Sequence, residues 1–111
     1  MSKVSVMGHF ACKPDKEMET RRMLVRMVDA AREEPGVEIY SYHEGEDGRF
    51  WFFALMRDPE SMASHGTSDA MRQAMAPFAD LIAEPPEMNV LSPIAAIGLE
   101  REDGRRSTRS T

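Results

Sequence analysis

Residues 49–57, with the sequence RFWFFALMR, constrain the fold more than any other segment of this chain. Successive side chains of a β-strand point to opposite faces of its sheet. Large apolar side chains occupy both faces here, whereas a strand with one wet face alternates apolar with polar residues. The segment is therefore predicted to be a central strand that is covered on both sides. The chain has 111 residues, enough for one domain, so a single layer of helices is expected to cover one side.

The segments around this strand follow the periodicities of further strands and helices. Residues 3–12 and 37–44 alternate with a period of two, which indicates strands, whereas 15–34 carries an apolar stripe at helical spacing. The expected elements are a strand at 3–12, a helix at 15–34, a strand at 37–44, a hairpin turn at 45–48, the strand at 49–57, a short helix from 59 to about 65, a helix from a cap at Thr67 or Ser68 to about 83, and a strand at 87–97 interrupted by Pro93. This order predicts an α+β domain of the ferredoxin-like β-α-β-β-α-β plan, with a four-stranded antiparallel sheet and helices on one face, over residues 1–99. The tail 100–111 has no hydrophobic pattern and is predicted to be disordered.

Composition excludes several classes of partner. The formal net charge is -5, and an acidic surface repels both nucleic-acid phosphates and anionic membranes. No segment approaches the ~20 apolar residues of a membrane helix, and residues 1–7 lack the pattern of a signal peptide. The one cysteine, Cys12, cannot form an internal disulfide. We therefore expect a cytoplasmic protein that binds neither nucleic acid nor membrane.

The second apolar face of residues 49–57 predicts a partner. We assign Phe50, Phe52, Ala54 and Met56 to that second face, and the side chains from Trp51 to Arg57 to the helices. Leaving a fully buriable apolar side chain in water costs ~1.5–3 kcal/mol, which packing against the sheet of a second copy removes. Residues 94–99 (IAAIGL) could reach across to this copy. The expected assembly is a homodimer, and the alternative is a monomer with an apolar surface.

The chain resembles the antibiotic biosynthesis monooxygenase family of dimeric α/β barrels over about residues 4–94. The stretches that carry the resemblance are VSVMGHFACKPDKE, EEPGVEIYSYHEGEDG and RDPESMASHGTSDAMRQAM, the last of which places His65 at the family histidine. Members include oxygenases of aromatic polyketides, quinol oxidases, haem-degrading enzymes and proteins with no known activity. Several oxygenases use neither metal nor flavin, because an electron-rich phenolate substrate reduces O₂. Those members use an asparagine and a tryptophan on the third strand, where this chain has Phe53 and Arg57.

The resemblance implies a cofactor-independent monooxygenase that acts with O₂ on a planar phenolic, quinol or polyketide-like molecule. The predicted catalytic residues are His65, as a base, and Arg57, as a cation for a developing oxyanion. The predicted substrate-binding residues are Trp51, Phe53, His9 and Met75. Each has a structural alternative: Trp51 as a core anchor, Arg57 as a partner of Glu60, His65 as a helix-end residue and His9 as an ordinary sheet residue.

The alternative function is a non-catalytic dimeric ligand-binding or stress-response module of the same fold. No metal site is expected, because the three histidines and Cys12 follow no metal-binding spacing. Haem binding through His65 is a weaker alternative that rests on the resemblance alone.

Overall fold

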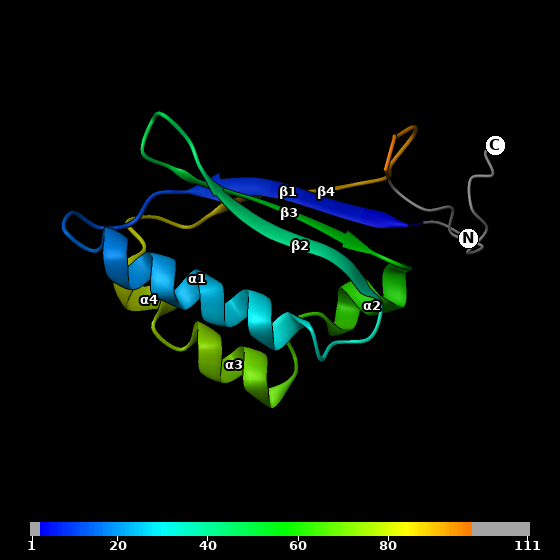
Figure 1. Cartoon of the computed structure of the whole chain (residues 1–111), viewed down its shortest axis with the longest axis horizontal. Helices are drawn as coiled ribbons and strands as arrows, with labels where there is room; N and C mark the ends of the chain where they lie inside the picture. The colour runs from blue at the N-terminus through cyan, green and yellow to red at the C-terminus, as the bar shows by residue number, and fades with distance from the viewer. Residues whose placement is uncertain (1–2, 99–111) are drawn as a thin grey trace.

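The fold is a four-stranded antiparallel sheet with every helix on one face (Figure 1). The computed structural model describes residues 3–98, so the predicted tail at 100–111 lies outside the described residues. The elements are β1 (Val4–Phe10), α1 (Glu17–Ala31), β2 (Val37–Glu44), β3 (Phe50–Met56), α2 (Pro59–Ser64), α3 (Asp69–Met75), α4 (Phe78–Leu81) and β4 (Glu87–Leu91). The strand order β2-β3-β1-β4 confirms the predicted ferredoxin-like plan, and the sheet does not close on itself. Within residues 3–98, no helix is long and apolar enough to cross a membrane.

The second helical region consists of three short helices, of which α2 and α3 begin at capping side chains. The side chain of Asp58 accepts a hydrogen bond of 2.8 Å from the Ser61 amide at the start of α2, and Ser68 caps α3 through the Met71 amide at 3.1 Å. Both starts were predicted. The predicted single helix to residue 83 is wrong, because Pro77 separates α3 from α4. A proline removes an amide donor and clashes with the preceding turn, so the helix cannot continue through it.

The register between β1 and β3 decides which side chains meet the helices. Phe50, Phe52, Ala54 and Met56 lie opposite Phe10, Gly8, Val6 and Val4 in β1, and this even-numbered set points toward the helices. The predicted assignment of the two faces of β3 is therefore wrong. Trp51 and Phe53 lie on the uncovered face, and the side chain of Trp51 is 42% exposed. The reason is that β1 has its continuous apolar face at Val4, Val6 and Phe10, and directly paired residues of antiparallel strands share a face.

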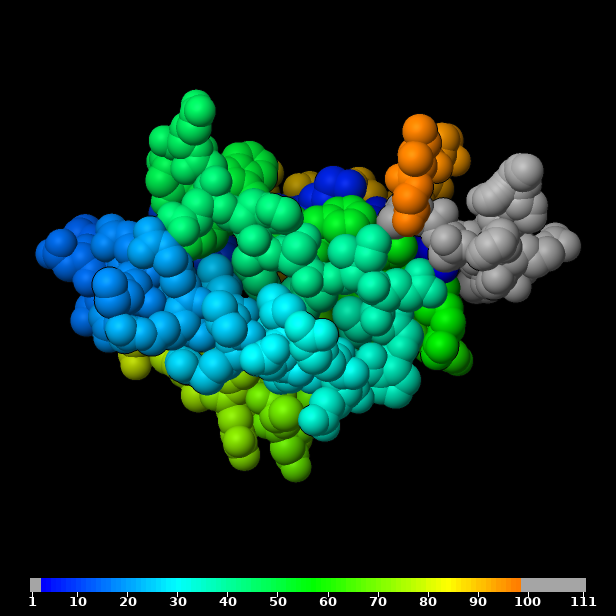
Figure 2. All heavy atoms as spheres, viewed as in Figure 1, coloured from blue at the N-terminus to red at the C-terminus, as the bar shows by residue number. Residues whose placement is uncertain are grey.

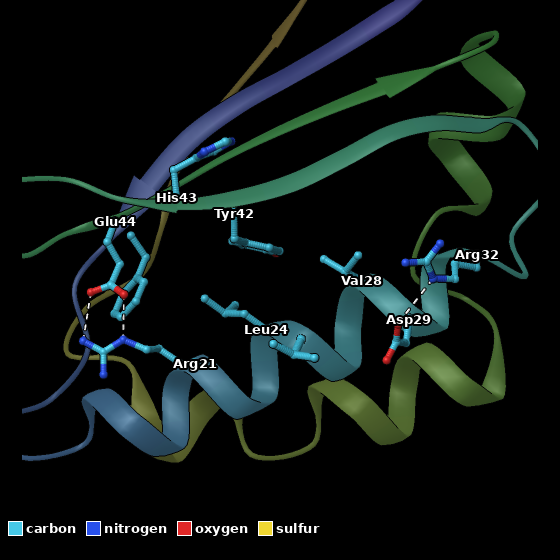
Figure 3. Close-up of a pocket in the computed structure, with 10 residues that line it drawn as sticks. Arg21, Leu24, Val28, Asp29, Arg32, Tyr42, His43 and Glu44 are labelled. Carbon is cyan, nitrogen blue, oxygen red and sulfur yellow. Dashed lines mark hydrogen bonds and ion pairs between the residues drawn. The ribbon is translucent and has the colours of Figure 1, made fainter.

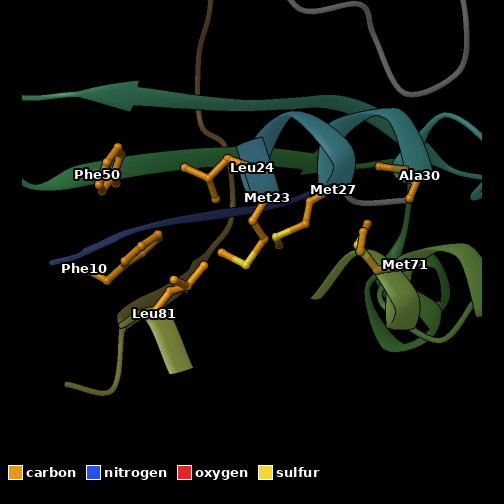
Figure 4. Close-up of a cluster of buried hydrophobic side chains, with 10 residues drawn as sticks. Phe10, Met23, Leu24, Met27, Ala30, Phe50, Met71 and Leu81 are labelled. Carbon is orange, nitrogen blue, oxygen red and sulfur yellow. The ribbon is translucent and has the colours of Figure 1, made fainter. Parts of the chain in front are cut away.

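The main core lies between this sheet face and α1, α3 and α4 (Figure 4). The ring of Phe10 stacks on Phe50 at a centroid distance of 5.6 Å and meets Phe78 edge-on at 5.4 Å. Met23 and Met27 of α1 and Met71 of α3 fill the space between the two layers. Unbranched methionine side chains fit such irregular gaps, which accounts for several of the ten methionines.

Gly8 lets β4 and Phe52 approach β1 closely. A Cβ atom at this position would overlap the carbonyl oxygen of Glu87 and lie 2.6 Å from Cζ of Phe52. Strand interiors carry glycine where another backbone or side chain comes this near. Because Phe52 lines the pocket described below, Gly8 also helps to shape that pocket.

The opposite face of the sheet has no covering layer in the described chain. The 45–48 hairpin and segment 92–98 rise on either side of it (Figures 1 and 2). Across the strands, Glu87, His9, Trp51 and His43 form one row in register. Met7 is 42% exposed on this face, and the side chains of Ile94 and Ile97 beyond β4 are wholly exposed. β4 ends at Leu91, opposite Ser5, rather than at residue 97, because β1 begins at Val4 and Pro93 lacks an amide donor.

The core assignment predicts a large difference between two methionines of α1. Met23 is 0% exposed, whereas Met18, on the same helix, is 62% exposed. Met23→Ala should lower the free energy of unfolding by about 2–5 kcal/mol, because it leaves a cavity between helix and sheet. Met18→Ala should change it by no more than about 0.5 kcal/mol.

Urea unfolding of both variants at one protein concentration measures the difference. Equal effects of the two substitutions would contradict the assigned core.

Candidate functional site

A partly open, mostly apolar pocket of about 210 Å³ lies between the helix-facing side of the sheet and the short helices. The sheet contributes Val6, Phe52 and Ala54 to its wall, and Met62, Met75 and Phe78 close it from the helical side. The polar side chains that line it are Tyr40, Tyr42 and His65. An apolar cavity with a few convergent polar groups is the usual form of a small-molecule site.

A buried carboxylate holds His65 at the edge of this pocket. The Oε1 atom of Glu34 lies 2.7 Å from Nδ1 of His65, and the Glu34 side chain is 6% exposed. The Oε2 atom of Glu34 accepts hydrogen bonds from the Gly66 amide at 3.0 Å and from the Ser68 hydroxyl at 3.1 Å. The carboxylate thus ties the end of α1 to the junction between α2 and α3, which are far apart in sequence.

The contact with Glu34 determines which ring nitrogen of His65 can accept a proton. An ionised carboxylate only accepts hydrogen bonds, so the facing Nδ1 atom carries a hydrogen and donates it. A neutral ring then has its lone pair on Nε2, and that atom can accept a proton. This arrangement of a carboxylate behind a histidine orients the ring of a general base.

Two tyrosines of β2 form the second polar element. The hydroxyl groups of Tyr40 and Tyr42 are 2.7 Å apart, and the ring of Tyr40 meets the His65 ring edge-on at 5.1 Å. Burial raises the pKa of Tyr42 to about 12 and, with the neighbouring Tyr42, raises the pKa of Tyr40 still further. Both phenols therefore stay protonated at neutral pH. In the sequence, Tyr40 and Tyr42 share a strand face with Glu38 and Glu44, which favours a solvent or interface face, whereas the structure turns both rings into the pocket.

The structure separates the predicted site residues into two groups. His65 and Met75 line the pocket. Trp51, Phe53 and His9 instead line a shallow hollow of about 380 Å³ on the uncovered sheet face, where the His9 and Trp51 rings lie 4.4 Å apart.

Arg57 belongs to neither of these groups. Its side chain is 54% exposed, and its Nε atom lies 3.6 Å from a carboxylate oxygen of Asp58 rather than near Glu60. The guanidinium group forms an ordinary surface ion pair there.

Glu34, Tyr40 and Tyr42 are the pocket residues that the sequence analysis did not identify. The inward orientation of the tyrosines could have been predicted from the strand pairing. Residues of β3 that pair with the apolar positions of β1 share their face, and so do the residues of β2 that pair with those of β3. Nothing near Glu34 in the sequence points to His65, which is 31 residues away, because tertiary packing alone brings the two side chains together.

A larger hollow of about 450 Å³ runs between the outer side of α1 and the edge strand β2 (Figure 3). Arg21 pairs with Glu44 at 2.6 Å at one end, and Arg32 contacts Asp29 at 3.3 Å at the other. This hollow is an open groove whose charged groups are already paired with one another. We therefore assign the candidate site to the smaller, less open pocket. Within residues 3–98, no three histidine, cysteine or carboxylate side chains converge as a metal site would require.

The buried tyrosines predict a loss of stability at high pH. Unfolded tyrosine has a pKa near 10, and the folded pKa of Tyr42 is raised to about 12, so the folded state holds its proton more tightly. The contribution of Tyr42 to the free energy of unfolding should stay constant below about pH 10 and fall as the pH rises toward 12. The double variant Tyr40→Phe/Tyr42→Phe should lack this part of the fall.

Ultraviolet titration of tyrosinate with parallel urea unfolding measures the effect, and the chain's two tyrosines make the signal specific. Tyrosinate formation near pH 10 in the folded protein would contradict the assigned burial.

Comparison with known proteins agrees with this architecture. The model of the family described as antibiotic biosynthesis monooxygenase matches residues 3–77. An uncharacterised protein of Synechocystis sp. is 29% identical over 89 residues, which is 78% of this chain, and the chain spans 60% of the length of that relative. Both matches are similarities of sequence.

Solved structures show the same fold. Rv0793 of Mycobacterium tuberculosis is 27% identical, with a TM-score of 0.78 over 86% of this chain and 98% of that one. A protein of Chloroflexus aurantiacus, provisionally named an antibiotic biosynthesis monooxygenase, is 21% identical, with a TM-score of 0.76 over 87% of this chain and 98% of that one. The family model covers more than half of the sequence, over the segment that supplies β1 to α3 and with them most of the pocket. The chain therefore belongs to the antibiotic biosynthesis monooxygenase family.

Proposed function

We propose that this protein is a monooxygenase-type oxidoreductase that oxidises a planar phenolic or quinol compound in the pocket beside His65, without a cofactor. The observation that carries the proposal is the contact of 2.7 Å between Glu34 and Nδ1 of His65 at the edge of an apolar pocket. Membership of a monooxygenase family is consistent with this activity. The residues of the pocket wall are otherwise suited to binding a flat apolar ring.

In the proposed reaction, Nε2 of His65 accepts the proton of a substrate hydroxyl group. The resulting phenolate is electron-rich enough to reduce O₂. For a simple phenol, one oxygen atom enters the ring and replaces hydrogen, which gives a quinone, and the other oxygen atom leaves as water. The substrate supplies the four electrons, so the equation balances with the phenol and O₂ as the sole reactants. The apolar wall excludes water and strengthens the contact between the imidazolium ion and the phenolate.

Arg57 has no part in this proposal, because its exposed guanidinium group contacts Asp58 and does not line the pocket. Trp51, Phe53 and His9 are likewise left out of substrate binding. Their position on the uncovered sheet face suits them to contact with a second copy of the chain.

The second candidate function is ligand binding without turnover by a dimer of the same fold. It is favoured by the third-strand positions at which related oxygenases use asparagine and tryptophan. Here those positions hold Phe53 and Arg57. The two functions differ in one measurable property, the consumption of O₂.

The proposed reaction predicts that His65 is required for turnover. His65→Asn keeps an amide that can donate to Glu34 but provides no base, so O₂ consumption should fall about 100-fold or more. The matched substitution His43→Asn alters an exposed histidine outside the pocket and should leave the rate unchanged. Arg57→Ala should also keep the rate.

An oxygen electrode with a panel of phenols, quinols and anthrones provides the measurement. Full activity of His65→Asn would remove this histidine from the mechanism. Ligand binding with no O₂ consumption by the wild-type protein would favour the second candidate function.

We also propose that two copies pack through their uncovered sheet faces. Ile94 and Ile97 are wholly exposed, and Trp51 and Met7 are each 42% exposed, so large apolar side chains lie in water on this face and beside it. A symmetric pair would bury the same patch twice. Residues 92–98 stand beside this face, from which they can contact the partner (Figure 2).

The proposed dimer can be tested by sedimentation equilibrium at micromolar concentration. The wild-type chain should sediment as a dimer, and Ile94→Glu/Ile97→Glu should shift it toward a monomer, because the change would bury two carboxylates. Val25→Glu, on the exposed side of α1 at 62% exposure, is the control and should leave the dimer intact. A wild-type monomer at this concentration would refute the proposed dimer.

A further inference from the structure

The paired hydroxyl groups of Tyr40 and Tyr42 contain one hydrogen-bond donor more than the protein uses. Each phenol carries one O–H donor, and the contact of 2.7 Å between the two oxygens occupies one of these hydrogens. The second hydrogen has no protein acceptor among the described residues. Both side chains line the pocket, so a molecule in the cavity can reach this donor.

An unused donor in an apolar cavity is energetically costly. Folded proteins rarely leave a buried donor without an acceptor. The other described residues that line the pocket are almost entirely apolar, and the remaining polar side chain, His65, hydrogen-bonds to Glu34 and to neither tyrosine hydroxyl group. The group that satisfies the tyrosine hydrogen is therefore water or a ligand oxygen or nitrogen atom that enters the pocket from outside.

The pocket limits the size of the molecule that can bring this acceptor. At about 210 Å³, the pocket is smaller than the roughly 300–1,000 Å³ that is usual for sites of drug-sized ligands. A ligand with one aromatic ring or two fused rings suits a pocket of this size. The aromatic walls at Phe52 and Phe78 favour a flat shape.

We propose that Tyr40 and Tyr42 form an oxygen-binding subsite, which donates one hydrogen bond to a carbonyl, hydroxyl or phenolate oxygen of an aromatic ligand with one or two rings. This inference rests on the proposed function in taking the pocket as the ligand site. Both phenols remain protonated at neutral pH, so the subsite acts as a donor under all ordinary conditions. It sets the orientation of the ligand, because the donor is fixed to one strand of the sheet while His65 approaches from the helical side.

The test compares 2-naphthol with naphthalene, two probes that differ by a single oxygen atom. Affinity is measured under nitrogen by titration calorimetry, so that no oxidation accompanies binding. The wild-type protein should bind 2-naphthol more tightly than naphthalene. Tyr40→Phe/Tyr42→Phe should weaken 2-naphthol binding about tenfold and change naphthalene binding by less than about twofold.

The single variants add a readout that a merely structural role would not produce. In at least one of Tyr40→Phe and Tyr42→Phe, the remaining hydroxyl group should still donate to the ligand and keep most of the affinity. The double substitution keeps both rings and removes both partners of a hydrogen bond together, so it should fold with nearly unchanged stability at neutral pH. A thermal melt of each variant checks this.

The outcomes separate the subsite from the oxidation. Unchanged 2-naphthol affinity in the double variant, equal losses for the two probes, or no binding of either probe to the wild-type protein would each overturn the subsite. Selective loss of 2-naphthol affinity would support it, even if the wild-type protein consumed no O₂ with any substrate. In that case the proposed oxidation would be refuted, and the proposed binding subsite would still be supported.

Discussion

The pairing of β1 with β3 is the constraint on which the rest of the structure depends. Because opposite residues of antiparallel strands share a face, the apolar positions of β1 commit Phe50, Phe52, Ala54 and Met56 to the helices. The same register sends Trp51 and Phe53 to the other side of the sheet. Through β2 it also turns Tyr40 and Tyr42 inward, since they lie opposite Ala54 and Phe52. One set of hydrogen bonds thus decides the composition of the core, the pocket and the uncovered face.

The sequence was sufficient to predict the order of the elements, because that order depends on local signals. The alternation of β1, the hairpin turn at 45–48 and the capping residues Asp58 and Ser68 act within a few residues of where they stand. The break at Pro77 was also visible in the sequence, although the apolar positions on both sides suggested one helix. The resemblance to the antibiotic biosynthesis monooxygenases was correct for the same reason, since it rested on these stretches and their spacing.

The candidate site was less predictable because it depends on contacts between distant segments. A strand that is apolar on both faces does not reveal which face meets the helices, and taking the family positions at Phe53 and Arg57 as a guide led to the wrong face of β3. Of the predicted site residues, Met75 and His65 line the pocket. Glu34 had no local signal, because its three hydrogen-bond partners all come from residues 65–68.

The division of the helical layer into α2, α3 and α4 bears on how such a protein can change its ligand. The sheet side of the pocket belongs to long, cooperatively paired strands, where a substitution disturbs neighbours on two sides. The opposite side consists of three short helices, of which α2 and α3 begin at capping side chains, and they are joined through Gly66 and Pro77. One piece can shift or alter its side chains while the strands keep their register. The cavity therefore has a sheet wall that carries the tyrosine pair and a helical wall, anchored at His65 by Glu34, whose other side chains can change as new specificities evolve.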